Sequence, residues 1–75
     1  MPQNLYSAFC RNVRGRMSSL GITQTELARR LDVDPSYVSQ ILNGHRRPGL
    51  DSLESFAKAL KTDPADLIKT LVKVS

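Results

Sequence analysis

The fold of this 75-residue chain is decided by residues 23–44, which read TQTELARRLDVDPSYVSQILNG. Thr23 and Glu26 match a capping box, in which the threonine caps a helix and the glutamate reaches back to the start of that helix. Asp34 and Pro35 match a second helix start, because aspartate is a good N-cap and proline suits the first helical position. The stretch therefore predicts two short helices separated by a tight turn.

The residue types in this stretch fit the helix-turn-helix arrangement, in which two short helices cross after a tight turn. Ala28 is small where the two helices have to approach each other, and Val33 can close the turn with an apolar contact. Val38 and Ile41 direct one face of the second helix toward a core. The opposite face of that helix is then free for another purpose.

That outward face carries an uncharged polar row. Ser36, Gln40 and Asn43 fall at positions i, i+4 and i+7, opposite Val38. Such side chains can read base edges, because glutamine pairs bidentately with adenine, whereas contact with phosphates alone would favour lysine or arginine. A solvent-facing helix surface has the same spacing, so the pattern by itself leaves both interpretations open.

Helical spacing of apolar residues continues through the rest of the chain, without a convincing strand, repeat or linker. The pattern predicts an all-α fold, with one domain over residues 1–75 built from five short helices. The helices are expected near 4–20, 24–31, 35–43, 50–60 and 64–72. The expected core consists of Leu5, Phe9, Val13, Leu27, Ala28, Leu31, Val38, Ile41, Leu53, Phe56, Ala57, Leu60, Leu67 and Leu71.

Composition excludes several classes of protein. One cysteine, Cys10, and one histidine, His45, leave no internal disulfide, no multi-cysteine zinc site and little acid–base chemistry, so neither an enzyme nor a cofactor is expected. No run approaches the roughly 18–20 apolar residues that a membrane span needs. Since no N-terminal stretch matches a signal peptide either, a cytoplasmic protein without a membrane partner is expected.

Positive charge is concentrated in the first two thirds of the chain. Residues 1–47 carry seven arginines against three acidic residues, which accounts for the whole net charge of +4. Arg46 and Arg47 directly follow the second helix of the pair and are the strongest candidates for phosphate contacts, with Arg14 a weaker one. His45, in the same loop, fits either a phosphate contact or an ordinary loop position.

Several linked motifs resemble the lambda-repressor/Cro family of helix-turn-helix DNA-binding domains. They are GITQTELARRL at 21–31, YVSQILNG at 37–44, RRP at 46–48, FAKAL at 56–60 and DLI at 66–68. The resemblance covers about residues 12–70, which is nearly the whole chain. It implies a sequence-specific regulator of transcription, from a group of prokaryotic and phage proteins that usually bind two-fold operators as dimers.

The resemblance also implies roles for individual residues. Gln24 would touch a phosphate at the start of the first helix of the pair, and Asn43 and the loop after Gly44 would run along the DNA backbone. The residues implied to face the major groove are Pro35, Ser36, Tyr37, Ser39 and Gln40.

Two departures from the family pattern carry structural expectations. Asp32 stands where the family commonly has glycine, in a left-handed turn position that aspartate tolerates better than most residues. Met17 and Leu42 replace an arginine and a glutamate that often form a buried ion pair. Because a paired apolar replacement can be neutral while the loss of one partner is costly, we expect Met17 and Leu42 to be in contact.

The expected partners are double-stranded DNA with a pseudo-palindromic operator and a second copy of the chain, because one reading helix contacts too few bases for useful specificity. The candidate dimer interface consists of Ile68, Val72 and Val74. No small-molecule effector is expected, since no second domain is present to bind one. A phage switch protein, a restriction–modification controller and a self-repressing plasmid regulator all fit. Two other functions stay open: an antitoxin that binds a toxin and represses its own operon, and a protein-interaction module without DNA binding.

Overall fold

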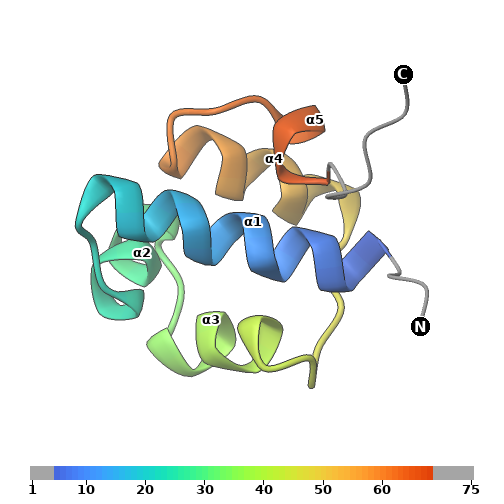
Figure 1. Cartoon of the computed structure of the whole chain (residues 1–75). Helices are drawn as coiled ribbons and strands as arrows, with labels where there is room; N and C mark the ends of the chain where they lie inside the picture. The colour runs from blue at the N-terminus through green and yellow to red at the C-terminus, as the bar shows by residue number, and fades with distance from the viewer. Residues whose placement is uncertain (1–4, 69–75) are drawn as a thin grey trace.

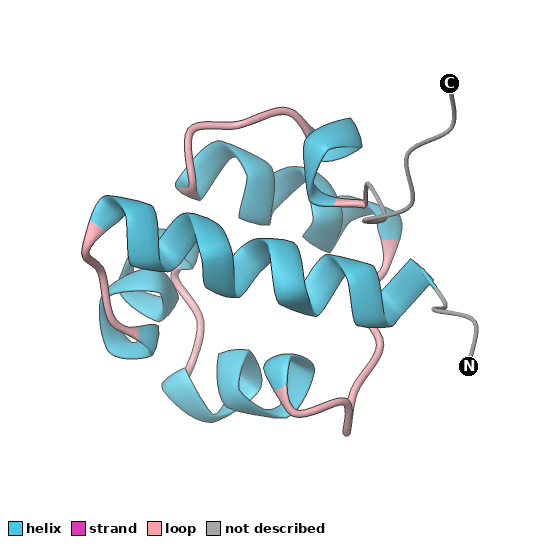
Figure 2. Ribbon diagram, viewed as in Figure 1, coloured by secondary structure: helices cyan, strands magenta, loops and turns pink. Residues whose placement is uncertain are grey.

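Helices and loops, and no strand, make up residues 5–68, the part of the chain that the computed structural model describes (Figures 1 and 2). The helices are α1 (Leu5–Leu20), α2 (Gln24–Leu31), α3 (Pro35–Leu42), α4 (Leu50–Ala59) and α5 (Pro64–Leu67). The predicted all-α fold is confirmed, and every helix begins within one residue of its expected start. The predicted continuation of the last helix over 69–72 lies outside the described residues.

Helix α1 lies across the middle of the molecule, with α3 on one side of it and α4 and α5 on the other (Figure 1). The Phe9 ring of α1 meets the Phe56 ring of α4 edge to face, with the ring centroids 5.3 Å apart. Met17 of α1 and Leu42 of α3 are both buried in the same apolar cluster, as expected if they replace the ion pair of the family. The core therefore joins helices from both sides of α1.

The buried core agrees closely with the prediction. It consists of Ala8, Phe9, Val13, Met17, Leu27, Ala28, Val38, Ile41, Leu42, Phe56, Ala57, Leu60 and Leu67. Leu31 and Leu53, which were expected in the core, are half-buried and pack against its edge. The Leu5 side chain and Leu71 lie outside the described residues. Ten of the fourteen expected positions are thus fully buried.

The predicted helix starts form, although the capping box is only half made. Thr23 Oγ1 accepts a hydrogen bond from the Glu26 backbone N–H at 3.1 Å, and Asp34 Oδ1 accepts one at 2.9 Å from the N–H two residues further on. The Glu26 carboxylate makes no bond back to Thr23, so that part of the prediction is wrong. It accepts hydrogen bonds from Arg29 and Arg30 instead, because charged donors bind a carboxylate more strongly than a neutral N–H does.

Two turns hold a residue other than glycine in the left-handed region. Asp32 has φ 59° at the end of α2, as its place in the family pattern implies, and Lys61 has φ 58° after α4. Gly21, which ends α1, has φ 68°, a value that glycine adopts without strain. The turns after α2 and α4 are therefore strained in a way that the turn after α1 is not.

Polar side chains of α1 hold the C-terminal ends of three other helices. The bonds are Asn12 Nδ2 to Leu67 O (2.8 Å), Arg14 Nη2 to Leu42 O (3.1 Å) and Arg16 Nη2 to Leu60 O (2.9 Å). The last carbonyl groups of a helix have no partner within that helix, so each bond satisfies an acceptor and fixes a helix end against α1. Nothing in the sequence pattern pointed to these bonds.

The strained turns predict two stabilising substitutions. Lys61→Gly should raise the free energy of unfolding by up to about 1 kcal/mol, because the left-handed conformation costs a residue with a Cβ about 1–2 kcal/mol and the freedom of glycine in the unfolded chain cancels part of that gain. Asp32→Gly should gain less, since aspartate tolerates this conformation better than lysine. Urea unfolding of the two variants measures both effects.

Gly21→Ala is the matched control. A Cβ at Gly21 would meet no atom within 4 Å, so its cost comes from the backbone conformation alone. This variant should lose about 1 kcal/mol of unfolding free energy. A Gly21→Ala protein as stable as the wild type would contradict the assignment of strain to these turns.

The carboxylate of Glu26 predicts a pH dependence of stability. Hydrogen bonds from Arg29 and then Arg30 lower the pKa of Glu26 from 4.5 to about 2. Because the pKa is lower in the folded state, the stability that this carboxylate contributes is present above pH 4.5 and is lost as the pH falls toward 2. The free energy of unfolding of Glu26→Gln, measured between pH 2 and pH 6, should vary less than that of the wild type. Glu54→Gln, which removes an exposed carboxylate of α4, should keep the wild-type dependence, and a flattening as large as that of Glu26→Gln would contradict the prediction.

Candidate nucleic-acid interface

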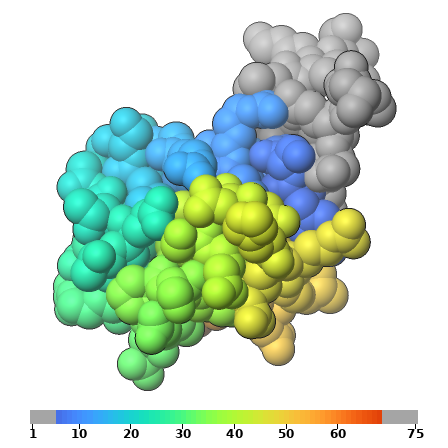
Figure 3. All heavy atoms as spheres, turned by 90° about the horizontal axis from the view of Figure 1, so that it is seen from below, coloured from blue at the N-terminus to red at the C-terminus, as the bar shows by residue number. Residues whose placement is uncertain are grey.

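Helix α3 presents the predicted polar row to the surface. Ser36, Gln40 and Asn43 are exposed, whereas Val38 and Ile41 on the opposite side are fully buried. In the face shown in Figure 3, α3 and the loop after it, coloured yellow-green to yellow, lie in front, with α2 and its turn beside them. Pro35, at the start of α3, is also exposed. Three of the five residues implied to face the major groove are therefore exposed.

The other two, Tyr37 and Ser39, are half-buried, and their hydroxyl groups already have protein partners. The Tyr37 hydroxyl lies 2.9 Å from Ser52 Oγ of α4, and Ser39 Oγ accepts from Asn43 Nδ2 at 3.2 Å. Tyr37 also packs against the apolar cluster. These contacts fix the Tyr37 and Ser39 side chains at the edges of the polar row. Both side chains can therefore hold the row in position and can also meet DNA.

Arg14 of α1 lies at the C-terminal end of α3. Its guanidinium donates to the Leu42 carbonyl and also to Asn43 Oδ1 at 3.3 Å. The structure thus brings two of the predicted phosphate-contacting residues, Arg14 and Asn43, into direct contact. Because Arg14 is exposed, donors of its guanidinium remain at the surface beside the row.

The loop after α3 sends its two arginines in different directions. His45, Arg46 and Arg47 are exposed, while Pro48 is buried and anchors the loop. Arg46 turns back to α3, where its guanidinium carbon lies 5.3 Å from the centroid of the Tyr37 ring. The guanidinium carbon of Arg47 lies 5.1 Å from the Tyr6 ring of α1. Both arginines stack on an aromatic ring, which holds each charge at a defined place on the surface.

The remaining arginines are mostly used within the protein. Arg29 and Arg30 of α2 both bind Glu26, and Arg30 also donates to the Ala59 carbonyl of α4 at 3.1 Å. Gln24, the predicted phosphate contact on α2, is half-buried at the first position of that helix. The N-terminal excess of positive charge therefore overstates the charge that is available to DNA.

Membrane insertion, metal binding and the state of the cysteine can be judged from the described part of the chain. Within residues 5–68, no helix is long and apolar enough to span a membrane, and no group of three His, Cys, Asp or Glu side chains could hold a metal ion. Cys10 is half-buried, its thiol donates to the Ile41 carbonyl at 3.0 Å, and burial raises its pKa despite the opposing charge of Arg14. A raised thiol pKa disfavours the reactive thiolate, as expected for a packed, inert cysteine.

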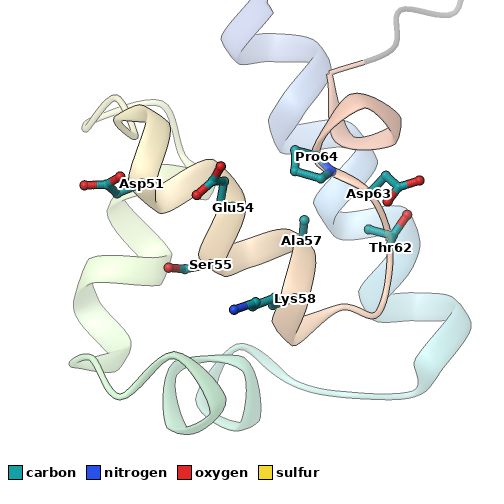
Figure 4. A pocket seen from close by; sticks show the side chains of 8 residues that line it. All are labelled: Asp51, Glu54, Ser55, Ala57, Lys58, Thr62, Asp63 and Pro64. Atoms are coloured by element: carbon teal, nitrogen blue, oxygen red, sulfur yellow. The ribbon is translucent and has the colours of Figure 1, made fainter.

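A hollow of about 590 Å³ lies between α4 and the loop that leads to α5 (Figure 4). Its rim carries the carboxylates of Asp51, Glu54 and Asp63, with Lys58 as the one cation among the lining residues. None of its lining residues belongs to α2 or α3. Since these carboxylates would repel a phosphate backbone, the hollow is not part of the nucleic-acid interface.

Of the three candidate dimer residues, Ile68 is the one that lies within the described part of the chain. Ile68 is half-buried and lines an apolar hollow of about 210 Å³ together with Tyr6, Phe9 and Leu53. Val72 and Val74 lie outside the described residues. Leu50, on the rim of the same hollow, is 81% exposed, although it belongs to the helically spaced apolar residues of 50–60.

Comparison with known proteins agrees with this geometry. Residues 14–67 match the family model of the helix-turn-helix domain HTH_3. The control protein C.BamHI of Bacillus amyloliquefaciens is 36% identical over 69 residues, which span 91% of this chain and 85% of that protein.

Solved structures share the fold at somewhat lower identity. The restriction-modification controller protein C.AhdI from Aeromonas hydrophila superposes with a TM-score of 0.77 at 29% identity, covering 83% of this chain and 94% of that one. A hypothetical transcription factor, NHTF from Neisseria, superposes with a TM-score of 0.88 at 27% identity, covering 95% of this chain and 84% of that one. The chain therefore belongs to the Cro/C1-type helix-turn-helix family and is a DNA-binding regulator of transcription.

Proposed function

We propose that this regulator controls a restriction–modification operon by binding, as a homodimer, a pseudo-palindromic operator through α3 in the major groove. The observation that carries the proposal is the uncharged polar row on α3, in which Ser36 and Gln40 are exposed to solvent. Neutral side chains of this kind suit base edges, while Gln24, Asn43 and Arg47 around them suit phosphates.

The controller role is supported by the relatives. C.BamHI is a control protein and C.AhdI is a restriction-modification controller protein, and this chain corresponds to most of the length of each. The similarity to C.BamHI spans nine tenths of this chain, so it includes α3 as well as the helices that hold it. These observations favour a controller over the antitoxin and the interaction module that the sequence left open.

A homodimer is the second part of the proposal. One reading helix contacts few base pairs, whereas two copies on a two-fold axis double the contacts and raise the specificity ratio. Ile68 and the exposed Leu50 border the apolar hollow at one end of α4, and we assign this surface, with Val72 and Val74, to the second copy. Residues 48–75 carry four lysines against four acidic residues, so two such surfaces would not repel each other.

The proposed division of contacts predicts two different mutant phenotypes. Gln40→Ala should cost roughly 1–3 kcal/mol of binding free energy on the operator and little on random DNA, because it removes a base contact. Arg47→Ala should weaken binding to both DNAs alike and should reduce the slope of log K against log salt by about 0.9, because it removes a phosphate contact. Fluorescence titrations at several salt concentrations, on an operator selected from a random duplex library, measure both quantities. Equal losses of Gln40→Ala on operator and random DNA would remove Gln40 from base reading.

The homodimer predicts a symmetric footprint. Sedimentation should show a dimer, and the protected operator should hold two half-sites about 10–10.5 bp apart, centre to centre. Leu50→Asp should shift the equilibrium toward monomer without unfolding the chain, since Leu50 is already 81% exposed. Ser55→Asp, an exposed position on α4 that does not line this hollow, is the matched control and should stay dimeric. A wild-type monomer that protects one non-palindromic half-site would defeat this part of the proposal.

A further inference from the structure

We propose that Arg46 reads a guanine in the major groove, acting as one unit with Tyr37 and Gln40, and is not the phosphate contact that its place in the loop after α3 suggests. The inference rests on the proposed function, because it names the base that one part of the α3 surface recognises. Three features of the structure lead to it: the position of the Arg46 side chain, the support beneath it and the hydrogen-bonding groups that it leaves free.

The Arg46 side chain folds back over the outer face of α3. Its guanidinium carbon lies 5.3 Å from the centroid of the Tyr37 ring, and its Nε donates to Gln40 Oε1 at 3.2 Å. Tyr37 and Gln40 are three residues apart and so lie side by side on the helix surface. The Arg46 guanidinium contacts both side chains. It thereby becomes part of the α3 face that would meet the base edges.

The support beneath Arg46 is fixed to the core. Tyr37 is half-buried, packs against the apolar cluster and has its hydroxyl 2.9 Å from Ser52 Oγ of α4. An exposed arginine of a loop is thus held by a ring that two helices keep in place. Because the side chain is ordered before DNA arrives, less conformational freedom is lost on binding.

The hydrogen-bonding groups that this unit leaves free are donors. A guanidinium has five N–H groups, and only the one on Nε has a partner among the residues that the structure describes. The same bond turns the Gln40 oxygen toward Arg46, so that its NH₂ group is the part of the amide left to meet a base. Guanine shows two acceptors, N7 and O6, in the major groove, whereas adenine shows one acceptor and one donor. A surface of donors therefore matches guanine and not the adenine that Gln40 by itself would favour.

The neighbouring arginine provides the contrast. Arg47 stacks on Tyr6 of α1 at 5.1 Å, and no side-chain hydrogen bond joins it to α3 among the described residues. Its charge lies to the side of the reading helix, where the DNA backbone passes if α3 occupies the groove. Arg46 and Arg47 have the same chemistry and adjacent positions, so they form a matched pair in which only the direction of the side chain differs.

The first experiment compares the selected sites of four proteins. Wild type, Arg46→Ala, Arg46→Lys and Arg47→Ala are each used to select binding sites from a random double-stranded library. The wild type should enrich a guanine at one fixed position of each half-site. Both Arg46 variants should lose that preference, with affinity for the wild-type site falling roughly 5- to 100-fold, because alanine has no donor and lysine lacks the planar fork. Arg47→Ala should keep the guanine and show a smaller salt slope.

The second experiment removes one of the two guanine acceptors, N7, from the DNA. A duplex in which 7-deazaguanine replaces the selected guanine keeps its Watson–Crick pairing but loses N7. Wild type should bind this duplex more weakly than the normal one, while Arg46→Ala should bind the two equally. Circular dichroism confirms that each variant is folded, as expected for an exposed side chain.

The outcomes separate this inference from the proposed function. If Arg46→Ala keeps the guanine preference and lowers the salt slope as Arg47→Ala does, Arg46 contacts phosphate and the inference alone is overturned. Wild-type binding that is indifferent to 7-deazaguanine overturns it as well. A wild type that enriches no sequence at all overturns both the inference and the proposed operator binding.

Discussion

The arrangement of this domain depends on donors from α1 that satisfy the last carbonyl groups of α3, α4 and α5. Asn12, Arg14 and Arg16 each bond to the end of a different helix, from a helix that lies in the middle of the molecule (Figure 1). The last carbonyl groups of a helix lack partners within that helix, so these bonds hold the end of each helix against α1. The end of α3 is the point from which the basic loop begins, and its position follows from Arg14.

Bonds within the protein also occupy much of the positive charge of the chain. Arginine is abundant in the first two thirds of the chain, but four of the seven arginines bind protein carbonyl groups or Glu26. Arg46 and Arg47 are exposed, and each is stacked on a tyrosine. The positive charge beside α3 is therefore smaller than the number of arginines suggests.

The outer surface of α3 is connected to the core by Tyr37. Its ring packs on the apolar cluster, its hydroxyl meets Ser52 of α4, and its outer face carries Arg46. The position of the guanidinium is thus linked to the packing of α3 against α4. A change in α4 that moves the Tyr37 ring would therefore also move Arg46.

The sequence by itself determined the helices, their starts and most of the core, since these follow from local spacing and from caps such as Thr23 and Asp34. It also predicted the exposed row of Ser36 and Gln40, because helical period fixes which residues share a face. Only the tertiary structure decided the partners of the long polar side chains. The bonds of the α1 arginines and the turn of Arg46 toward α3 depend on which acceptors and rings come within reach once the helices pack, and residue spacing carries no record of that.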